Sequence, residues 1–418
     1  MSIADATPST RTKKTKLREE SSPKALLRST MDHPLFDYRL LIVVAAVLLC
    51  LGLLMVISSS SVIAAATYQD PYYFGKRQLI FAGIGLLGAF FLSRCSEKLV
   101  RYVAWPALFL AALLIVLTIF TPLGIDVAGN RNWMSFGPSW TQFQPSEFAK
   151  LAIIIWGAND LANKRRVLVD MRQWLTYLCA TLLLVGLVLI QKDAGTAMVM
   201  AAIIIIVMVA VGAPWRLLAG FGISAVGAMA IMVLLEPYRM QRILAFLRPD
   251  SDPLGYNLQA RRGIYALASG GWFGQGLGSS RQKWGLLTEA HTDYIFAIIG
   301  EELGLLGTLT VILLFLILTA VGLRIALKSK SLFSKYVAIG VVAWFAAQAF
   351  ANIAVAIRLI PVLGIPLPMI SYGGSSLMAN LFALGLLAGC ARREPHAAQV
   401  FLTRKAKPKV TTIVRAQA

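Results

Sequence analysis

The chain has 418 residues, of which 57% are hydrophobic and only 14% are charged, and its formal net charge is +20. Soluble proteins carry about 25% charged residues, so this composition excludes an ordinary soluble domain and indicates a membrane protein. The basic residues are scattered over short loops and both tails, which argues against a nucleic-acid-binding protein.

Ten largely apolar segments are predicted to cross a bilayer, which takes a helix of about 20 residues. Backbone polar groups find no water inside hydrocarbon, so each crossing is expected to be helical. The predicted spans are 40–64, 77–93, 100–120, 147–163, 174–191, 196–212, 216–235, 294–323, 336–357 and 370–390. The sequence therefore predicts an all-α polytopic membrane domain over residues 40–391, with about ten transmembrane helices.

The distribution of Lys and Arg between the loops predicts the orientation of this domain. Placing both termini in the cytoplasm puts basic clusters such as Arg94, Lys98 and Arg101 on the cytoplasmic side. Residues 1–39 then form a disordered basic cytoplasmic tail with too little apolar content to fold alone, and residues 392–418 form a second basic cytoplasmic tail. No cleavable apolar core precedes the first span, so we expect that span to stay as an anchor.

One long external loop, residues 236–292, breaks this charge rule. It contains aromatic and apolar residues spaced for helical packing, so we expect it to be partly helical. A basic outer surface suits an anionic ligand such as a lipid phosphate, although arginines there could also merely contact lipid head groups. Its basic residues are Arg239, Arg242, Arg248, Arg261, Arg262, Arg281 and Lys283.

The stretch "EAHTDYIFAIIGEELG" places His291, Thr292 and Asp293 where this loop re-enters the membrane. A carboxylate at the edge of hydrocarbon is costly, which makes Asp293 a candidate functional residue. The alternative is structural, because an Asp at the start of a helix can cap it. Glu301 and Glu302 follow within the same span, and at least one of them should face a polar interior.

Further polar groups converge on the same external side. "QPSEFAKL" places Glu147 and Lys150 three residues apart on one helical face, where they can form an ion pair. "QKDAGT" puts Asp193 in a tight turn between the fifth and sixth spans. "IPVLGIPLPMISYGGSS" contains three prolines and three glycines, and such non-helical backbone is tolerated in a membrane protein only where it lines a cavity or is buried in protein.

These motifs resemble the SEDS family (shape, elongation, division and sporulation proteins) over residues 37–393. The resemblance rests on "GNRNWMSFG", "QPSEFAKL", "GQGLGSS", "EAHTDYIFAIIGEELG" and "IPVLGIPLPMISYGGSS" in this order. "LMVISSSSVIA" followed by "DPYYFGKRQL" is most similar to the division type, FtsW, with the elongation type, RodA, second. The resemblance implies a ten-helix membrane glycosyltransferase that polymerises lipid II into peptidoglycan strands outside the cytoplasmic membrane.

The resemblance also implies roles for particular residues. Asp293 falls on the essential catalytic acid of the family. Arg131, Glu147 and Lys150 match cavity residues, and Asp193 and the turn from Ser371 to Ser375 are carried over with them. The residues of the loop itself add Arg242, Arg261, Lys283 and His291 as candidate substrate-binding groups. Lys192 and Arg358 depart from the family pattern, which usually has Pro and Gly at these positions.

Glycan polymerisation requires a sugar hydroxyl to attack an anomeric carbon whose leaving group is a lipid pyrophosphate. A charge-compensated pyrophosphate leaves without a protonating acid, in contrast to glycoside hydrolysis with its two carboxylates. One general base therefore suffices, and we expect it to be Asp293. No cofactor is required by the sequence; a divalent cation, Mg²⁺ or Mn²⁺, is the alternative to Arg and Lys side chains for compensating the pyrophosphate.

The expected partners are lipid II, the lipid-linked nascent glycan, a class B penicillin-binding protein transpeptidase and other divisome membrane proteins at the division septum. Two other functions compete with polymerisation. A lipid II flippase would also have charged residues and broken helices within its spans, but we find no inverted repeat between the halves. A non-catalytic scaffold for the transpeptidase would leave the cost of placing Asp293 and Lys150 in the membrane unexplained.

Overall fold

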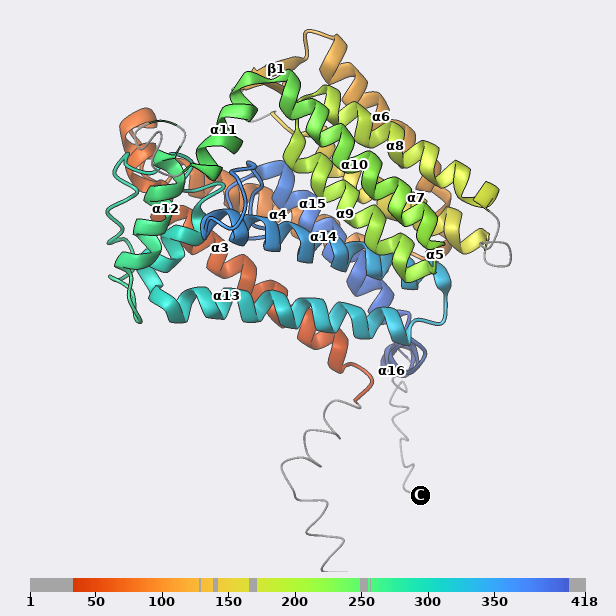
Figure 1. Cartoon of the computed structure of the whole chain (residues 1–418). Coiled ribbons are helices and arrows are strands. Elements are labelled where there is room, and N and C mark those ends of the chain that lie inside the picture. Colours follow the sequence, from red (N-terminus) through yellow and green to blue (C-terminus); the bar gives the residue numbers. More distant parts are fainter. Residues whose placement is uncertain are drawn as a thin grey trace, which may run out of the picture.

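A computed structural model describes residues 33–127, 129–137, 142–164, 171–248, 255 and 257–405, so most of the two predicted tails lies outside the described residues. The described chain is built almost entirely of helices (Figure 1). In chain order its elements are α3 (Phe36–Tyr68), α4 (Tyr73–Arg94), α5 (Glu97–Tyr102), α6 (Ala104–Phe120), β1 (Gly124–Val127), β2 (Asn130–Met134), α7 (Pro145–Asn163), η2 (Met171–Trp174), α8 (Leu175–Ile190), α9 (Ala194–Val211), α10 (Trp215–Leu235), α11 (Pro237–Leu247), α12 (Leu258–Ser269), α13 (Ile295–Lys328), α14 (Leu332–Ala356), α15 (Gly374–Arg392) and α16 (Pro395–Lys405).

Each of the ten predicted spans coincides with one of the longer helices, so the predicted fold class is confirmed. Within the described residues, eight helices are long and apolar enough to cross a membrane, and α6 is a shorter apolar helix. α7 is not among these eight, and it carries Glu147 and Lys150 in its first turns. The protein is therefore a multi-pass membrane protein.

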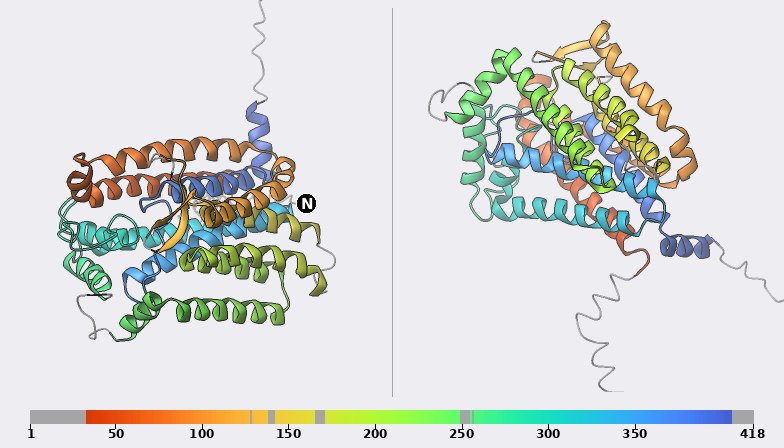
Figure 2. Two further views of the ribbon diagram at one scale, coloured as in Figure 1. Left: turned by 90° about the horizontal axis from the view of Figure 1, so that it is seen from above. Right: turned by 45° about the vertical axis from the view of Figure 1, so that its right-hand side comes forward.

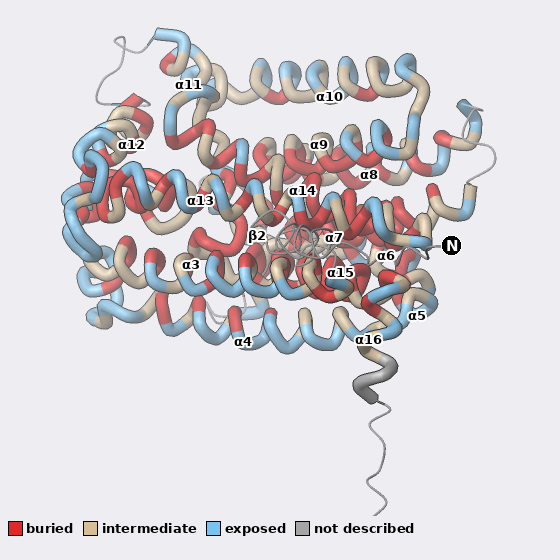
Figure 3. The backbone as a smooth tube through the Cα atoms, turned by 90° about the horizontal axis from the view of Figure 1, so that it is seen from below, coloured by how far each residue is buried: buried red, intermediate tan, exposed pale blue. Residues whose placement is uncertain are grey.

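The spans lie side by side, with α14 and α15 inside the bundle and α10 at its edge (Figure 2). Within the most apolar stretch of each helix, the share of buried residues is 78% for α14 and 83% for α15, but only 11% for α10. Figure 3 shows the same contrast in colour. Because α10 buries so little surface against protein, most of its apolar side chains are left to contact lipid.

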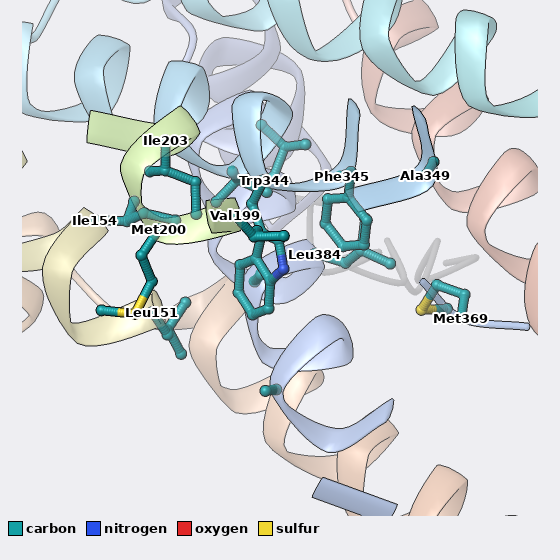
Figure 4. Packing of buried hydrophobic residues seen from close by; sticks show 14 of the residues in the cluster. Leu151, Ile154, Val199, Met200, Ile203, Trp344, Phe345, Ala349, Met369 and Leu384 are labelled. Atoms are coloured by element: carbon teal, nitrogen blue, oxygen red, sulfur yellow. The ribbon is translucent and has the colours of Figure 1, made fainter. Parts of the chain in front are cut away.

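The core lies where α7, α9, α14 and α15 meet (Figure 4). Trp344 and Phe345 of α14 are almost completely buried there and belong to the same apolar cluster as Ile154, Met200 and Leu384. Lipid tails are as apolar as these side chains, so close van der Waals packing is what favours this arrangement inside a membrane.

Ion pairs tie the two ends of the described chain together at one end of the bundle, which we call the basic end. Asp37 accepts hydrogen bonds from Arg324 at 2.8 Å and from Lys328 at 2.6 Å. Lys328 also lies 3.8 Å from Glu394, just before α16. Since Asp37 is part of this cluster, α3 begins at Phe36 and residues 36–39 are helical, whereas we expected them to belong to the disordered tail.

The opposite end of the bundle, which we call the cavity end, holds the hairpin and the long loop. β1 and β2 pair antiparallel, with Gly124 opposite Met134 and Ile125 opposite Trp133, and connect α6 to α7. The loop between α10 and α13 contains α11 and α12, so the prediction of a partly helical loop is confirmed. In Figure 1 these two helices lie far from α5 and α16.

α13 is interrupted at Gly304, whose φ of 70° and ψ of −165° are not helical. The glycine-rich segment after α12 fills the break. It donates backbone hydrogen bonds from Gln275 to the Glu301 carbonyl at 2.9 Å and from Gly276 to the Glu302 carbonyl at 3.0 Å, and its own Gly271 carbonyl accepts from the amide of Leu305 at 2.9 Å. The backbone groups freed by the break are thereby satisfied, as they must be at the edge of a membrane.

This contact predicts a specific requirement for glycine at position 274. A Cβ there would lie 2.2 Å from the Glu302 carbonyl oxygen, and the φ of Gly274 is +78°. We expect Gly274→Ala to destabilise the protein by about 1–3 kcal/mol, the usual cost of overpacking. The measurement is the melting temperature of the purified protein in detergent.

Gly227→Ala is the matched control, because a Cβ on Gly227 in α10 meets nothing within 4 Å. That variant should melt at the temperature of the unsubstituted protein or above it, since Ala favours helix. Equal melting temperatures for the two variants would contradict the close contact between the glycine-rich segment and α13.

Candidate active site

A cavity of about 920 Å³ opens at the cavity end of the bundle. Its walls come from α4, β2, the turn between α8 and α9, α10, α11, the segment before α13 and the irregular segment between α14 and α15. Ligand sites usually measure about 300–1,000 Å³, so this cavity can take a large head group. We expected the Pro- and Gly-rich segment to line a cavity, and this is confirmed for Pro361 to Gly364.

Charged side chains of both signs line the cavity in equal numbers. A site that binds a pyrophosphate and also carries out proton transfer needs side chains of both signs. Cations hold the anionic leaving group, while a carboxylate takes the proton. The basic lining residues are Arg77, Lys192, Arg239 and Arg242, and the acidic ones are Asp193, Glu236, Glu289 and Asp293.

The backbone around Asp293 is fixed by side chains from α14 and from the segment before α15. Asn352 of α14 donates to the Asp293 carbonyl at 2.7 Å and to the Ile365 carbonyl at 2.8 Å. The Ser371 hydroxyl donates to the Thr292 carbonyl at 2.6 Å. These bonds hold the residue in place while leaving its side chain directed to the cavity that it lines.

The Asp293 carboxylate accepts no hydrogen bond from the residues that the structure describes. It does not cap α13 either, because the N-cap is Tyr294 and makes no side-chain cap bond. The structural alternative for this residue is thereby excluded. Burial raises the pKa of Asp293 to about 7, the nearby charge of Glu289 acts in the same direction, and Arg242 opposes both. A carboxylate with such a pKa can take up a proton near neutral pH.

Asp193 differs from Asp293 because both of its carboxylate oxygens accept hydrogen bonds. One of its oxygens accepts from Asn132 at 3.0 Å and from Gln144 at 2.7 Å. The other accepts from the backbone amide of Thr196 at 3.0 Å, which caps the start of α9. With both oxygens engaged, Asp193 connects β2 and the start of α7 to α9 and is not available as a base.

Cations reach the cavity from α11 and from the turn before α9. Arg242 lies 3.5 Å from the Val362 carbonyl oxygen, to which it donates. Arg239 donates to the Lys192 carbonyl and to the Asn130 side chain, the latter at 3.3 Å. Lys192 pairs with Glu236 at 2.6 Å. This last pair is at the rim, because both side chains are at least 31% exposed.

Glu147 and Lys150 are not among the described residues that line the cavity. They form a buried ion pair at 2.7 Å, and Lys150 also donates to Gln348 at 2.9 Å. Gln348 in turn donates to the Pro366 carbonyl at 2.9 Å. The expected direct contact with substrate is therefore corrected to a supporting role, in which this pair holds the Pro- and Gly-rich wall from behind.

Three further predicted residues also support the cavity from behind. Ser371 holds the Thr292 carbonyl, and Ser375 accepts from the backbone amide of Gln144 at 2.9 Å. The His291 ring packs against Phe74 with ring centroids 4.8 Å apart. Burial lowers the pKa of His291, against the effect of Glu289, and so disfavours the charged imidazolium form.

The last three predicted cations are engaged away from the cavity, which corrects our expectation that they contact substrate. Arg131 donates to the carbonyls of Thr118 and Thr121 at the end of α6. Arg261 donates to the Tyr265 hydroxyl at 3.1 Å. Lys283 is buried and donates to the Gly278 carbonyl at 2.6 Å. Of the predicted site residues, the cavity is thus lined by Asp193, Arg242 and Asp293.

Sequence reasoning missed several lining residues. Arg77 lies in "DPYYFGKRQL", a stretch that we used only to distinguish subtypes. Gln144 directly precedes "PSEFAKL", so its position beside the motif was the available signal. Glu289 begins the stretch "EAHTDYIFAIIGEELG", so its place four residues before Asp293 was the available signal, whereas Glu236 at the other end of the loop belongs to no motif.

The described residues of this site do not form a group of side chains placed to coordinate a metal ion. Over the described part of the chain, no group of three or more His, Cys, Asp and Glu residues is placed to hold a metal ion. Among the acids that line the cavity, Asp193 has both oxygens engaged and Glu236 pairs with Lys192, which leaves Asp293 and Glu289. We therefore assign no step of the chemistry to a metal ion.

The length of α14 gives the depth of Asp293. Asn352, which binds the Asp293 carbonyl, lies twenty residues after Leu332 at the start of α14 near the basic end. At about 1.5 Å per residue this is about 30 Å, the thickness of the hydrocarbon core. Asp293 is therefore separated from the basic end by about the thickness of the hydrocarbon core.

Comparisons with known proteins agree on one family. A sequence model of the FtsW, RodA and SpoVE family, described as cell cycle proteins, matches residues 38–396. The chain is 40% identical over 322 residues to the probable peptidoglycan glycosyltransferase FtsW of Trichlorobacter lovleyi, covering 77% of this chain and 84% of the relative. It is 38% identical over 326 residues to the stage V sporulation protein E of Bacillus subtilis, covering 78% and 88%.

Two solved structures are similar over most of their length. One belongs to a peptidoglycan synthase complex that coordinates polymerization and crosslinking; it has a TM-score of 0.68 and 29% identity, covering 85% of this chain and 97% of that chain. The other is the rod shape determining protein RodA of Thermus thermophilus, with a TM-score of 0.64, 29% identity, and coverage of 85% and 96%.

The contrast between the two aspartates predicts opposite effects on stability. Asp193→Asn replaces an acceptor oxygen by a donor beside Asn132 and Gln144, and leaving such buried groups unsatisfied costs about 1–3 kcal/mol. Asp293→Asn removes no hydrogen bond and removes a charge that burial disfavours. Because its folded pKa is raised, Asp293 costs stability as pH rises towards about 7, and the full cost is present above it.

The measurement is the melting temperature at pH 8 of both purified variants. Asp193→Asn should melt below the unsubstituted protein, and Asp293→Asn should melt at the same temperature or higher. A clear loss of stability in Asp293→Asn would show that its carboxylate holds a structural bond, contrary to the geometry described.

Proposed function

The chain belongs to the FtsW, RodA and SpoVE family of cell cycle proteins, and from that premise we propose that its cavity polymerises lipid II into peptidoglycan strands at the outer face of the cytoplasmic membrane during cell division. Peptidoglycan glycosyltransferase is also the activity in the name of its FtsW relatives. The observation that carries the proposal is the Asp293 carboxylate, which lines a charged cavity, accepts no hydrogen bond from the described residues, and lies about one hydrocarbon-core thickness from the basic end.

The proposed step is a displacement at an anomeric carbon. A sugar hydroxyl of one lipid-linked saccharide forms a bond to the anomeric carbon of the other, and the bond from that carbon to the pyrophosphate oxygen breaks. The hydroxyl proton passes to Asp293, and the electron pair leaves with the lipid pyrophosphate. A positioned general base contributes about 10²–10⁴-fold to such a step.

Arginine side chains supply the charge compensation for the leaving group. Arg242 is close enough to influence the pKa of Asp293, so a pyrophosphate bound by Arg242 would sit near the base. Arg77 and Arg239 line the same cavity from α4 and α11. Guanidinium groups suit phosphate oxygens because they can donate two parallel hydrogen bonds.

The depth of the cavity suits a lipid-linked substrate. Its pyrophosphate would lie at the level of Asp293, and the lipid chain would remain in the hydrocarbon below. α10 contributes Met229 and Val233 to the cavity wall while burying little of its own surface. An apolar wall facing the bilayer gives the lipid chain a place beside the bundle.

Orientation and partners complete the proposal. The basic end would face the cytoplasm under the positive-inside rule, with both termini there and the cavity outside, and the protein would act at the division septum. A class B penicillin-binding protein would crosslink the strands and other divisome membrane proteins would assemble with it. In support, the similar solved complex coordinates polymerization and crosslinking.

The decisive variant is Asp293→Asn, tested with purified protein and purified lipid II. We expect the rate of glycan strand synthesis, followed on gels, to fall by about 10²–10⁴-fold, the contribution of a general base. Asp126→Asn on β1 is the matched control, because Asp126 is exposed and accepts a bond from Gly129 that an Asn oxygen can also accept.

A lipid-flipping assay in liposomes separates the alternatives. Polymerisation lost in Asp293→Asn without any flipping by either protein supports the proposal. Flipping of lipid II by the unsubstituted protein, with no strand synthesis, would favour a flippase. Full strand synthesis by Asp293→Asn would remove Asp293 from the mechanism.

A further inference from the structure

Large apolar side chains project outward from the segment between α12 and α13, which fills the break in α13. Four of them form what we call the aromatic edge: Trp272, Phe273, Leu277 and Trp284, exposed by 68%, 81%, 61% and 69%. So large an exposed apolar set marks a binding surface or a contact with the membrane. Neither the cavity nor the proposed polymerisation uses these four residues.

Buried carboxylates hold this segment rigidly. Glu301 accepts from the Ser280 hydroxyl at 2.5 Å and from the backbone amide of Arg281 at 2.9 Å. Glu302 accepts from the hydroxyl of Ser58 in α3 at 2.7 Å and lies 3.5 Å from the ammonium group of Lys283. The aromatic edge is therefore presented by a fixed backbone and not by a free loop.

The lengths of two helices give the distance between this segment and the basic end. In α13, Leu306, whose amide binds the Trp272 carbonyl at 3.2 Å, lies twenty-two residues before Lys328, which is about 33 Å of helix. In α3, Ser58 lies twenty-one residues after Asp37, which is about 32 Å. Asp37 and Lys328 are bonded to each other, so both measures start from the same level.

Both heights match the thickness of a bilayer. The hydrocarbon core is about 30 Å thick, so the aromatic edge lies where hydrocarbon meets the head groups. Trp is the residue most enriched at this boundary, together with Tyr, because an apolar ring with a polar N–H or O–H suits it. Arg281, which is exposed in the same segment, can reach the phosphates above.

The aromatic edge also continues an exposed apolar surface of a candidate span. Leu306, Leu309, Leu313 and Leu316 of α13 are 48%, 48%, 56% and 61% exposed and form a stripe along the span. Trp272 adjoins the upper end of this stripe through its bond to Leu306. An apolar surface continuous with a transmembrane stripe at the same depth is covered by the same lipid.

We propose that Trp272, Phe273, Leu277 and Trp284 form a lipid-binding surface that sits in the outer boundary of the bilayer and fixes the height of the neighbouring cavity relative to lipid head groups. The surface would bind the head-group and upper acyl region of ordinary phospholipids. Its effect is positional, since it holds α12, the glycine-rich segment and the residues leading to Asp293 at one depth.

Site-directed spin labelling of the full chain in phospholipid vesicles tests this. The four cysteines, Cys50, Cys95, Cys179 and Cys390, are first replaced by Ala. A nitroxide is then attached at Phe273→Cys, with Asp126→Cys on the exposed hairpin as the aqueous control and Leu313→Cys on α13 as the lipid control. Vesicles of phosphatidylethanolamine and phosphatidylglycerol contain no substrate and no partner protein, so the outcome is independent of the polymerisation proposal.

We expect the label at 273 to be several-fold less accessible to a water-soluble nickel complex than the label at 126, and to lie at a shallower depth than the label at 313. Nickel accessibility at 273 equal to that at 126 would overturn the proposal and would leave the surface open in water for a protein partner. If Phe273→Cys does not fold, Leu277→Cys carries the same expectation.

A second measurement needs no label. Lipids brominated in the upper part of the acyl chain should quench part of the tryptophan fluorescence of the protein, and Trp272→Phe with Trp284→Phe should remove a share of that quenching. Quenching that is unchanged in the double variant would show that neither indole reaches lipid and would contradict the proposal.

Discussion

Two residues from distant parts of the chain hold the backbone at Asp293, and no hydrogen bond from the described residues reaches its carboxylate. Asn352 and Ser371 hold the carbonyls of residues 293 and 292, and Asn352 also holds the Ile365 carbonyl of the irregular segment. Burial then acts on an acid that has no donor from the described residues to stabilise its charge, which raises its pKa to about 7. These bonds place the Asp293 carboxylate at the wall of the cavity.

The two irregular segments of the membrane domain are stabilised by different means. The Pro- and Gly-rich segment is held from behind by the chain of contacts from Glu147 through Lys150 and Gln348 to the Pro366 carbonyl. The glycine-rich segment instead exchanges backbone hydrogen bonds with the two halves of α13. Several buried charges in this protein thus hold backbone in place, whereas the Asp293 carboxylate lines the cavity and accepts no hydrogen bond from the described residues.

Apolar length, a local signal, was sufficient to predict the long helices, and the cost of a carboxylate at the edge of a span singled out Asp293, which does line the cavity. The sequence was insufficient for the side chains around that carboxylate. Lys150 and Arg242 are both cations near Pro- and Gly-rich backbone, and only the three-dimensional structure shows that Arg242 lines the cavity while Lys150 lies behind its wall. The hydrogen bonds from Asn132 and Gln144 to Asp193 join residues 61 and 49 positions apart, for which no spacing rule exists.

We propose that Asp293 acts as a base whose pKa is raised by burial, and the pH dependence of lipid II polymerisation at low substrate concentration is the measurement that tests this role. The pyrophosphate of lipid II is esterified at both ends and does not titrate near neutrality, so the profile reports groups of the free enzyme. The base must be ionised to act, so the rate should fall as pH decreases through an apparent pKa near 7. A rate that stays constant down to pH of about 5, as an ordinary carboxylate would give, would contradict the account.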